Sequence, residues 1–434
     1  MNKVLRLFLF FFLTISCSLD KKSGLWTKAD KIENAKDLVI VELFKEEKNF
    51  DNEFNSNIRI QLKSKLSKNS FSNNLSNNNG RVDYDGNLKT ISKYKFSKID
   101  NFNKFEPEMV FDQNNVIFFD NKGSILKFDQ FSKLIWKKNY YNKSDKKLKP
   151  ALNMASYQSY LIVVDNLAKY YAIDIENGNL LWMKRNIAPF NSQIKVYKDN
   201  FFVTDFQNIL RCYSIKDGEE LWNIKTDTSF VKSQKKLSLI ISEGKVYFNN
   251  TVGDISAVDI DKGKLVWQTP TQDSSIYEGS FYLKMSDLIL ANKSILFSNN
   301  KNEFFSLDIN TGTLIWQQKI NSSVRSTVVD NFVFSVTEEG FLVIIESETG
   351  DIIRITNVFN RIKEKKRLNI RPVGFVVGLK NIYLTTNNGR LIVIDVLTGK
   401  PVLMLKIDNE SISMPFILDK NLFIIKDNAI IKLN

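Results

Sequence analysis

The stretch AVDIDKGKLVW, residues 257–267, follows the pattern small-x-Asp-x-x-x-Gly-x-x-x-Trp, which recurs along the chain. Close copies are AIDIENGNLLW at residues 172–182 and SLDINTGTLIW at residues 306–316, and a fourth copy ends at Trp222. Divergent copies end at Trp136, Arg354 and Leu403, so that the seven end positions lie 38 to 49 residues apart. A repeat of this length has the size of one propeller blade of four short strands.

Each position of the repeat has a physical role. Its aspartate can accept hydrogen bonds from backbone N–H groups of the following turn, and its glycine permits the positive φ angle of that turn. Its tryptophan begins the next strand, where a large ring can fill the wedge between neighbouring blades. The blade-motif residues so predicted are Asp174, Gly178, Trp182, Trp222, Asp259, Gly263, Trp267, Asp308, Gly312 and Trp316.

The segments between the motifs indicate strands rather than helices. Residues 382–394 alternate apolar and polar positions around Asn388-Gly389, a pair that favours a two-residue hairpin turn. The last copy, residues 413–434, stops before any glycine or tryptophan, and residues 88–99 can supply its missing strand. We therefore predict an all-β fold, a β-propeller of eight four-stranded blades closed by N- and C-terminal strands. Seven blades are the alternative.

The N-terminus has the layout of a secretory signal. Lys3 and Arg6 precede an apolar run at residues 7–15, which is too short to cross a hydrocarbon core of about 30 Å. Residues 13–17 resemble a bacterial lipobox, which predicts acylation of Cys17, and Ser18 after it favours the periplasmic face of the outer membrane. The predicted domains are a signal peptide (1–16), a lipidated tether that is mostly linker (17–80) and the propeller (81–434).

Composition and motifs argue against nucleic-acid binding and catalysis. The net charge is +13, but the lysines are spread along the chain, so no nucleic-acid partner is expected. The chain has no histidine, no adjacent cysteine pair and no P-loop, nucleophile elbow or zinc spacing. Cys212 occupies the small position of a motif, so we expect it to be buried. The sequence therefore predicts no catalytic residues, no cofactor and no metal site.

The repeat resembles the tryptophan-docking motif of the pyrroloquinoline-quinone family of propellers over about residues 88–434. One branch of that family holds quinone-dependent dehydrogenases, which use a quinone, a calcium ion, an adjacent cysteine pair and an aspartate base. The other branch is the BamB family of outer-membrane assembly lipoproteins. The lipobox and the single propeller favour the BamB branch.

Resemblance to the BamB family implies a non-catalytic scaffold of the outer-membrane barrel assembly machinery. Such proteins dock a BamA-like partner through loops on one face and assist the insertion of unfolded outer-membrane proteins. The partner-binding residues that the resemblance implies are Lys232, Lys235, Ser286 and Asp287. A dehydrogenase-like quinoprotein and a propeller that binds another cell-envelope partner remain the alternatives.

Overall fold

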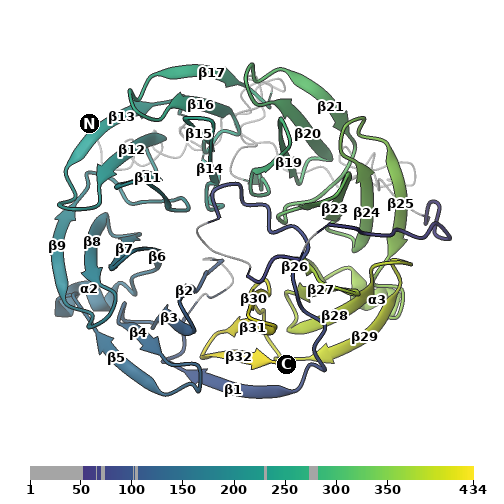
Figure 1. Ribbon diagram of the computed structural model, residues 1–434, viewed down its shortest axis with the longest axis horizontal. Helices are drawn as coiled ribbons and strands as arrows, with labels where there is room; N and C mark the ends of the chain where they lie inside the picture. The colour runs from purple at the N-terminus through teal and green to yellow at the C-terminus, as the bar shows by residue number, and fades with distance from the viewer. Residues whose placement is uncertain are drawn as a thin grey trace, which may run out of the picture. The chain divides into compact units, whose positions relative to one another are not determined.

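The computed structural model describes residues 52–64, 66–69, 74–100, 102, 106–228, 232–272 and 282–434. The predicted signal peptide and the anchor residue Cys17 lie outside the described residues. Residues 49–434 form one compact unit, in which eight four-stranded antiparallel sheets are arranged in a ring (Figure 1). The prediction of an eight-bladed all-β propeller is confirmed.

In blades 1 to 7 the four strands follow one another from the centre of the ring outward. Blade 1 comprises β2 (Val110–Asp112), β3 (Asn115–Phe119), β4 (Ile125–Phe128) and β5 (Leu134–Lys138). Blade 2 comprises β6 (Leu152–Tyr157), β7 (Tyr160–Asp165), β8 (Lys169–Asp174) and β9 (Leu180–Arg185), and blade 3 comprises β10 (Lys195–Tyr197), β11 (Asn200–Thr204), β12 (Ile209–Ser214) and β13 (Glu220–Lys225). Blade 4 comprises β14 (Leu239–Ser242), β15 (Lys245–Asn249), β16 (Ile255–Asp259) and β17 (Leu265–Thr269), and blade 5 comprises β18 (Ile289–Ala291), β19 (Ser294–Asn299), β20 (Glu303–Asp308) and β21 (Leu314–Gln318). Blade 6 comprises β22 (Thr327–Val329), β23 (Phe332–Val336), β24 (Phe341–Glu346) and β25 (Ile352–Asn357), and blade 7 comprises β26 (Pro372–Val377), β27 (Asn381–Thr386), β28 (Arg390–Asp395) and β29 (Pro401–Lys406).

Blade 8 joins the first strand of the described chain to the last three. Its inner three strands are β30 (Phe416–Leu418), β31 (Asn421–Lys426) and β32 (Ala429–Leu433), and its outer strand is β1 (Thr90–Lys95). The pairing runs from Thr90 opposite Leu433 to Lys95 opposite Ala429. Residues 88–99 thus supply the missing strand, as the sequence predicts.

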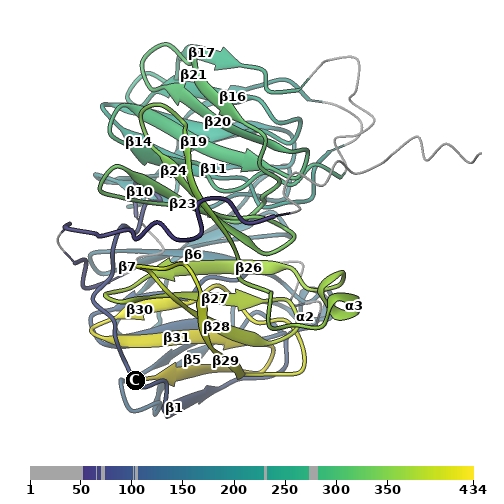
Figure 2. The same cartoon turned by 90° about the vertical axis from the view of Figure 1, so that its right-hand side faces the viewer.

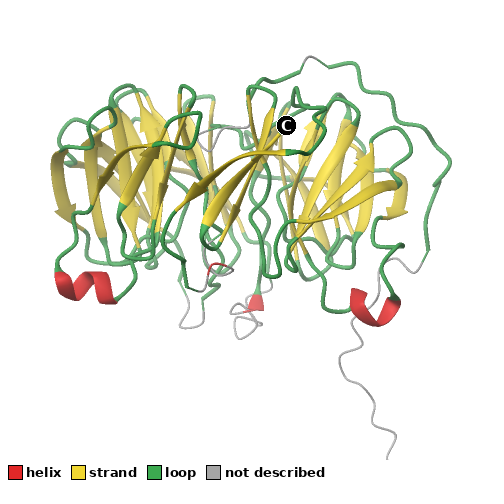
Figure 3. Cartoon of the chain, turned by 90° about the horizontal axis from the view of Figure 1, so that it is seen from below, coloured by secondary structure: helices red, strands yellow, loops and turns green. Residues whose placement is uncertain are grey.

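The ring has two distinct faces. The hairpin face carries the turns that join the first strand to the second and the third to the fourth in each blade. The loop face carries the connections from the outer strand of one blade to the inner strand of the next. Two short helices, α2 (Lys143–Lys147) and α3 (Glu364–Arg367), belong to these connections and project from the same face (Figure 3).

A motif tryptophan joins each of blades 1 to 5 to its successor. Trp267 Nε1 donates a hydrogen bond of 3.2 Å to the carbonyl oxygen of Ile309, and its ring lies against Gly312. A Cβ atom at Gly312 would come within 2.4 Å of that ring, so only glycine allows this approach. Equivalent tryptophan–glycine contacts are Trp136 with Gly178, Trp182 with Gly218, Trp222 with Gly263 and Trp316 with Gly350.

Two junctions use other side chains for the same task. In blade 6 the guanidinium of Arg354 lies against Gly399, and its Nη2 donates to the carbonyl oxygen of Val396 at 3.2 Å. In blade 8 the hydroxyl of Tyr94 donates to the carbonyl oxygen of Gln130 at 3.3 Å. Both acceptors follow directly after the acidic position of the next motif, which is the position where Trp267 also finds its acceptor, Ile309 after Asp308.

The remaining motif positions also behave as the sequence predicts. Asp259 Oδ1 accepts hydrogen bonds from the backbone N–H groups of Asp261 and Lys262 at 3.1 and 2.7 Å. Cys212 pairs directly with Trp222 across strands β12 and β13 and is fully buried, and burial raises the pKa of its thiol to about 12. A buried thiol of high pKa is a packing group rather than a nucleophile.

Replacing Gly312 by Ala should destabilise the ring by about 2 to 4 kcal/mol, because the methyl group needs a left-handed backbone and displaces the Trp267 ring. Gly244 is the matched control, since it has the same positive φ but nothing within 4 Å of its Cβ position. Gly244→Ala should cost only about 1 kcal/mol. Reversible chemical unfolding measures both, and equal costs would show that the contact with Trp267 is not the reason for Gly312.

Candidate functional site

Residues 74–82 cross the centre of the ring on the hairpin face (Figures 1 and 2). Their backbone carbonyls accept hydrogen bonds from the inner strands, Leu75 from Ile241 N and Ser76 from Leu290 N. Further along, Val82 N donates to the carbonyl of Val377 in blade 7. This central segment therefore gives hydrogen-bond partners to the inner edges of several blades.

The centre of this contact is Asn77, whose side chain is only 1% exposed. Its Nδ2 lies 3.1 Å from the Leu239 carbonyl of blade 4 and 2.9 Å from the Leu288 carbonyl before blade 5. Its Oδ1 accepts from Lys195 Nζ at 2.6 Å, and the same ammonium reaches the carbonyl of Asn74. Residues 74–80 fall in the range whose composition predicts mostly linker. They differ from a linker because their amide side chains form hydrogen bonds with buried polar groups of the ring.

A second group of polar side chains lies on the loop face around the centre of the ring. We name Glu106, Glu108, Lys235, Lys236, Asp287 and Arg325 the loop-face cluster. Arg325 Nη2 lies 2.5 Å from Asp287 Oδ2 and 3.2 Å from Glu108 Oε1. Lys236 Nζ lies 3.4 Å from the same oxygen of Glu108, and Lys235 pairs with Glu106 at 2.5 Å.

The cluster links blades that are far apart in the ring. Glu108 precedes blade 1, Lys236 precedes blade 4, and Asp287 and Arg325 precede blades 5 and 6. Burial alone would raise the pKa of Asp287, but Arg325 and Lys235 outweigh it and lower that pKa to about 2. The carboxylate is therefore ionised at neutral pH, and the cluster is a network of paired charges on the loop face.

The structure brings together two of the four predicted partner-binding residues, Lys235 and Asp287. Lys232 lies apart from them, since its Nζ donates to the carbonyl of Phe206 at 2.8 Å. Ser286 is 2% exposed, and its Oγ accepts from Ser298 N at 2.9 Å. The serine hydroxyls at 192 and 413 accept from backbone N–H groups twelve residues further on in the same way, so Ser286 belongs to a repeated structural bond.

Sequence reasoning missed Glu108, Arg325, Lys236 and the buried Lys195. One signal was available, because Glu108, Asp287 and Arg325 each stand two residues before the first strand of their blades. Aligning the repeats on that strand would have placed the three charges at one level of the ring. The motif used for the prediction lies at the outer end of each blade and gives no information on this level.

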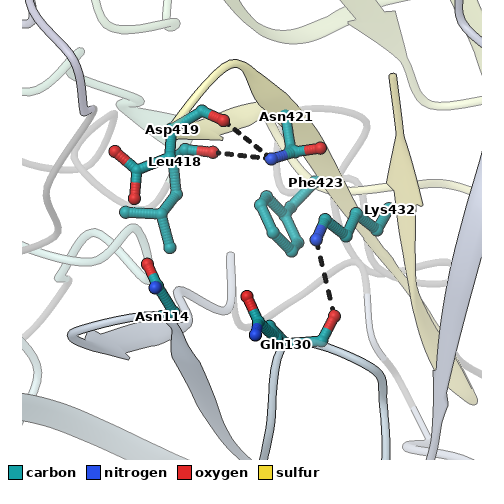
Figure 4. Close-up of a pocket in the computed structure, with 7 residues that line it drawn as sticks. All are labelled: Asn114, Gln130, Leu418, Asp419, Asn421, Phe423 and Lys432. Atoms are coloured by element: carbon teal, nitrogen blue, oxygen red, sulfur yellow. Dashed lines mark hydrogen bonds between the residues drawn. The ribbon is translucent and has the colours of Figure 1, made fainter.

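A shallow pocket of about 260 Å³ lies away from both groups, between blades 8 and 1 (Figure 4). Lys432 Nζ donates to the carbonyl of Gln130 there at 3.4 Å, and Asn421 Nδ2 donates to the carbonyl of Asp419 at 2.7 Å. Phe423 closes its floor but is 2% exposed, so little apolar surface is offered. None of the predicted site residues lines this pocket.

Two features are absent from the described residues. Within the described ranges, no three acidic, cysteine or histidine side chains come together as a metal-binding group would require. In the same part of the chain, no helix has the length and apolar character needed to span a bilayer.

The eight blades and the docked tryptophans define the chain as a propeller of the pyrroloquinoline-quinone type. The family model described as "Outer membrane protein assembly factor BamB" matches residues 121–356, which is more than half of the chain. The protein therefore belongs to the BamB family. No protein of curated function matches it significantly in sequence.

Solved structures share the fold at low sequence identity. BamB from Moraxella catarrhalis matches with a TM-score of 0.63 and 13% identity over 80% of this chain and 99% of that protein. The quinohemoprotein alcohol dehydrogenase from Comamonas testosteroni matches with a TM-score of 0.64 and 11% identity over 85% of this chain and 81% of that enzyme. The computationally designed Ika8 protein has a TM-score of 0.58 at 12% identity, over 78% and 99% of the two chains. At these identities the likeness concerns the fold alone.

The buried ammonium of Lys195 predicts a dependence of stability on pH. Burial, followed by the charge of Arg325, lowers the pKa of Lys195 from 10.5 to about 7. Between these two values the unfolded chain holds the proton and the folded chain does not, so stability gains from this group as pH rises. Between pH 7 and 9 the wild type should gain about 2 kcal/mol relative to Lys195→Met. Chemical unfolding of both proteins tests this, and parallel curves would contradict it.

Proposed function

We propose that this BamB-family propeller is a non-catalytic scaffold lipoprotein of the outer-membrane β-barrel assembly machinery. It docks a BamA-like partner and assists insertion of unfolded barrel proteins. It is held at the periplasmic face of the outer membrane by a lipid on Cys17. The observation that carries this proposal is the match of the family model to residues 121–356, and the site geometry adds a docking face.

The loop face is the docking face of this proposal. Residues 74–82 cross the centre of the hairpin face, whereas the centre of the loop face presents the charged side chains of the loop-face cluster. Charged groups around a docking surface select a partner of complementary charge and fix its orientation. Within the cluster, Asp287 and Lys235 are the proposed partner-binding residues, while Lys232 would contribute from outside the cluster and Ser286 would shape the loop.

The blade edges support a role in handling unfolded strands. The outer strand of blade 4 exposes Leu265 and Val266, which are 46% and 47% accessible, beside its unpaired edge. Blade 6 shows that such an edge accepts an extended segment, because Phe54 exchanges two backbone hydrogen bonds with Ile355 of β25 at 2.8 and 3.1 Å. Strand addition of this kind recognises backbone and alternate apolar side chains, which suits unfolded barrel strands.

The quinoprotein alternative is less well supported by the residues present. A calcium ion takes carboxylate and carbonyl oxygens, but Glu108 and Asp287 in the loop-face cluster are already paired with Arg325. The sequence has no adjacent cysteine pair, and Cys212 is buried in blade packing. These residues fit a quinone and calcium site poorly, which supports a scaffold rather than a dehydrogenase. Another cell-envelope partner remains the second alternative.

The docking role of Asp287 can be separated from its ion pair with Arg325. Asp287→Arg alone should weaken capture of a purified BamA-like periplasmic domain at least about tenfold and should also destabilise the loop face, since it leaves two cations in contact. The double variant Asp287→Arg/Arg325→Asp restores the pair with its charges exchanged. We expect it to recover only part of the stability, because the new carboxylate at position 325 faces Glu108, and not to recover capture, because the partner meets the reversed charge pattern.

Capture is measured by binding of the two purified proteins, and thermal unfolding of each variant controls for the fold. Recovery of capture by the double variant would assign Asp287 a structural role only. Normal levels of folded outer-membrane barrels after deletion of the whole protein would refute the scaffold proposal itself.

Replacing Cys17 by Ala should release the protein from the membrane fraction or leave it unprocessed, because the acyl chains would have no attachment site. Fractionation of cells that produce the variant, with the wild type alongside, measures this directly. Normal outer-membrane fractionation of the variant would remove the lipid anchor from the proposal.

A further inference from the structure

The loop face carries most of the strongly exposed large apolar side chains. Five such side chains among the described residues are more than 60% exposed, and four lie on connections of the loop face. They are Leu148 (62%), Ile187 (86%), Tyr282 (74%) and Leu368 (68%), while Phe131 (76%) lies on the hairpin face. Exposed apolar groups gathered on one face mark a contact surface for a partner or a membrane.

Two of these side chains follow short basic helices. Leu148 comes directly after α2, whose last turn holds Lys146 and Lys147. Leu368 comes directly after α3, whose last turn holds Lys365, Lys366 and an arginine. In the part of the chain that the structure describes, no carboxylate lies within ion-pair distance of these four lysines. We name residues 143–149 and 363–368 the two basic turns.

The two basic turns are placed for simultaneous contact with one flat surface. Both project from the loop face (Figure 3), α2 between blades 1 and 2 and α3 between blades 6 and 7. They flank blade 8 (Figure 1), whereas Lys235 and Asp287 of the loop-face cluster precede blades 4 and 5 on the other side of the ring. The basic turns lie at the rim of the ring, whereas the loop-face cluster lies around its centre, so the two surfaces are formed by different residues.

The N-terminal segment reaches the ring beside one basic turn. Phe54 pairs with Ile355 in β25, and Asn357, which ends β25 at the loop face, donates to Glu53 Oε1 at 3.1 Å. The connection that follows Asn357 leads directly to α3. The described chain thus begins on the side of the ring from which the basic turns project.

We propose that the two basic turns bind an anionic lipid surface, with Leu148 and Leu368 inserted among the headgroups. Lysines near such a surface are attracted to it, and a leucine at the tip of each turn adds apolar burial. Positive charge on both turns complements anionic headgroups, and a flat bilayer reaches both turns at once, unlike a small protein domain. The inference goes beyond the proposed function, which supplies only the expectation that a membrane is close.

Vesicle binding tests the proposal without the acyl anchor. The chain lacking its first 17 residues keeps the whole compact unit of residues 49–434 and carries no acylated cysteine. Two triple variants each remove one basic turn, Lys146→Glu/Lys147→Glu/Leu148→Asp and Lys365→Glu/Lys366→Glu/Leu368→Asp. Each should bind phosphatidylcholine vesicles containing about 30% phosphatidylglycerol about tenfold or more weakly than the parent, which itself should bind pure phosphatidylcholine poorly.

The matched control makes the same chemical changes on the hairpin face. Phe131→Asp/Lys133→Glu/Lys216→Glu also reverses two exposed lysines and replaces one exposed apolar side chain. It should bind the anionic vesicles within about twofold of the parent. Thermal unfolding shows that each variant is folded.

Equal losses of vesicle binding in the control and the turn variants would show that the net charge of +13 alone explains the binding, and this would overturn the proposal. Unchanged vesicle binding by the turn variants, with lost capture of a BamA-like domain, would assign the turns to a protein partner instead. Failure of the docking proposal is a separate result. It is measured by capture with the Asp287 variants, and it does not alter the vesicle binding measured here.

Discussion

The approach of a motif ring to the glycine of the next blade is the contact on which the whole ring depends. At Gly312 the space for a Cβ atom is taken by Trp267, and the indole N–H bonds to the backbone three residues before that glycine. One side chain thus fixes both the distance and the rotation between two sheets. Repeated around the ring, this contact determines where the inner strands and the loops before them come to lie.

Much of the fold could be predicted from the sequence, because the contact between the tryptophan of one blade and the glycine of the next requires a strict local sequence pattern. The spacing of aspartate, glycine and tryptophan is set by one turn and one strand, so it survives in a single sequence. Arg354 and Tyr94 perform the same task with different chemistry, and only the structure shows that Tyr94 docks on blade 1. Leu403, at the corresponding position of blade 7, is 43% exposed and makes no such bond, because its side chain has no donor group, and the last blade has no motif glycine for it to pack against.

The candidate site was less predictable because its residues meet across the ring. Glu108 and Arg325 are 217 positions apart in the sequence, and no local pattern relates them. The composition around Asn77 predicts a linker, because asparagine-rich sequence is typical of linkers. Here the amide serves as a donor and acceptor between inner strands, a role that depends on the finished ring and cannot be recognised in a segment considered alone.

The composite eighth blade has a consequence for the order of events in folding. Its pairing joins Thr90 to Leu433, and residues 74–82 bind inner strands of blades that are synthesised later. Contacts between such distant parts close large loops, which makes their formation slow. A chain synthesised from its N-terminus therefore keeps β1 without its partner until β32 has been made, and leaves the central segment incompletely bound until blade 7 has been made. Closure of the ring therefore follows the synthesis of all eight blades.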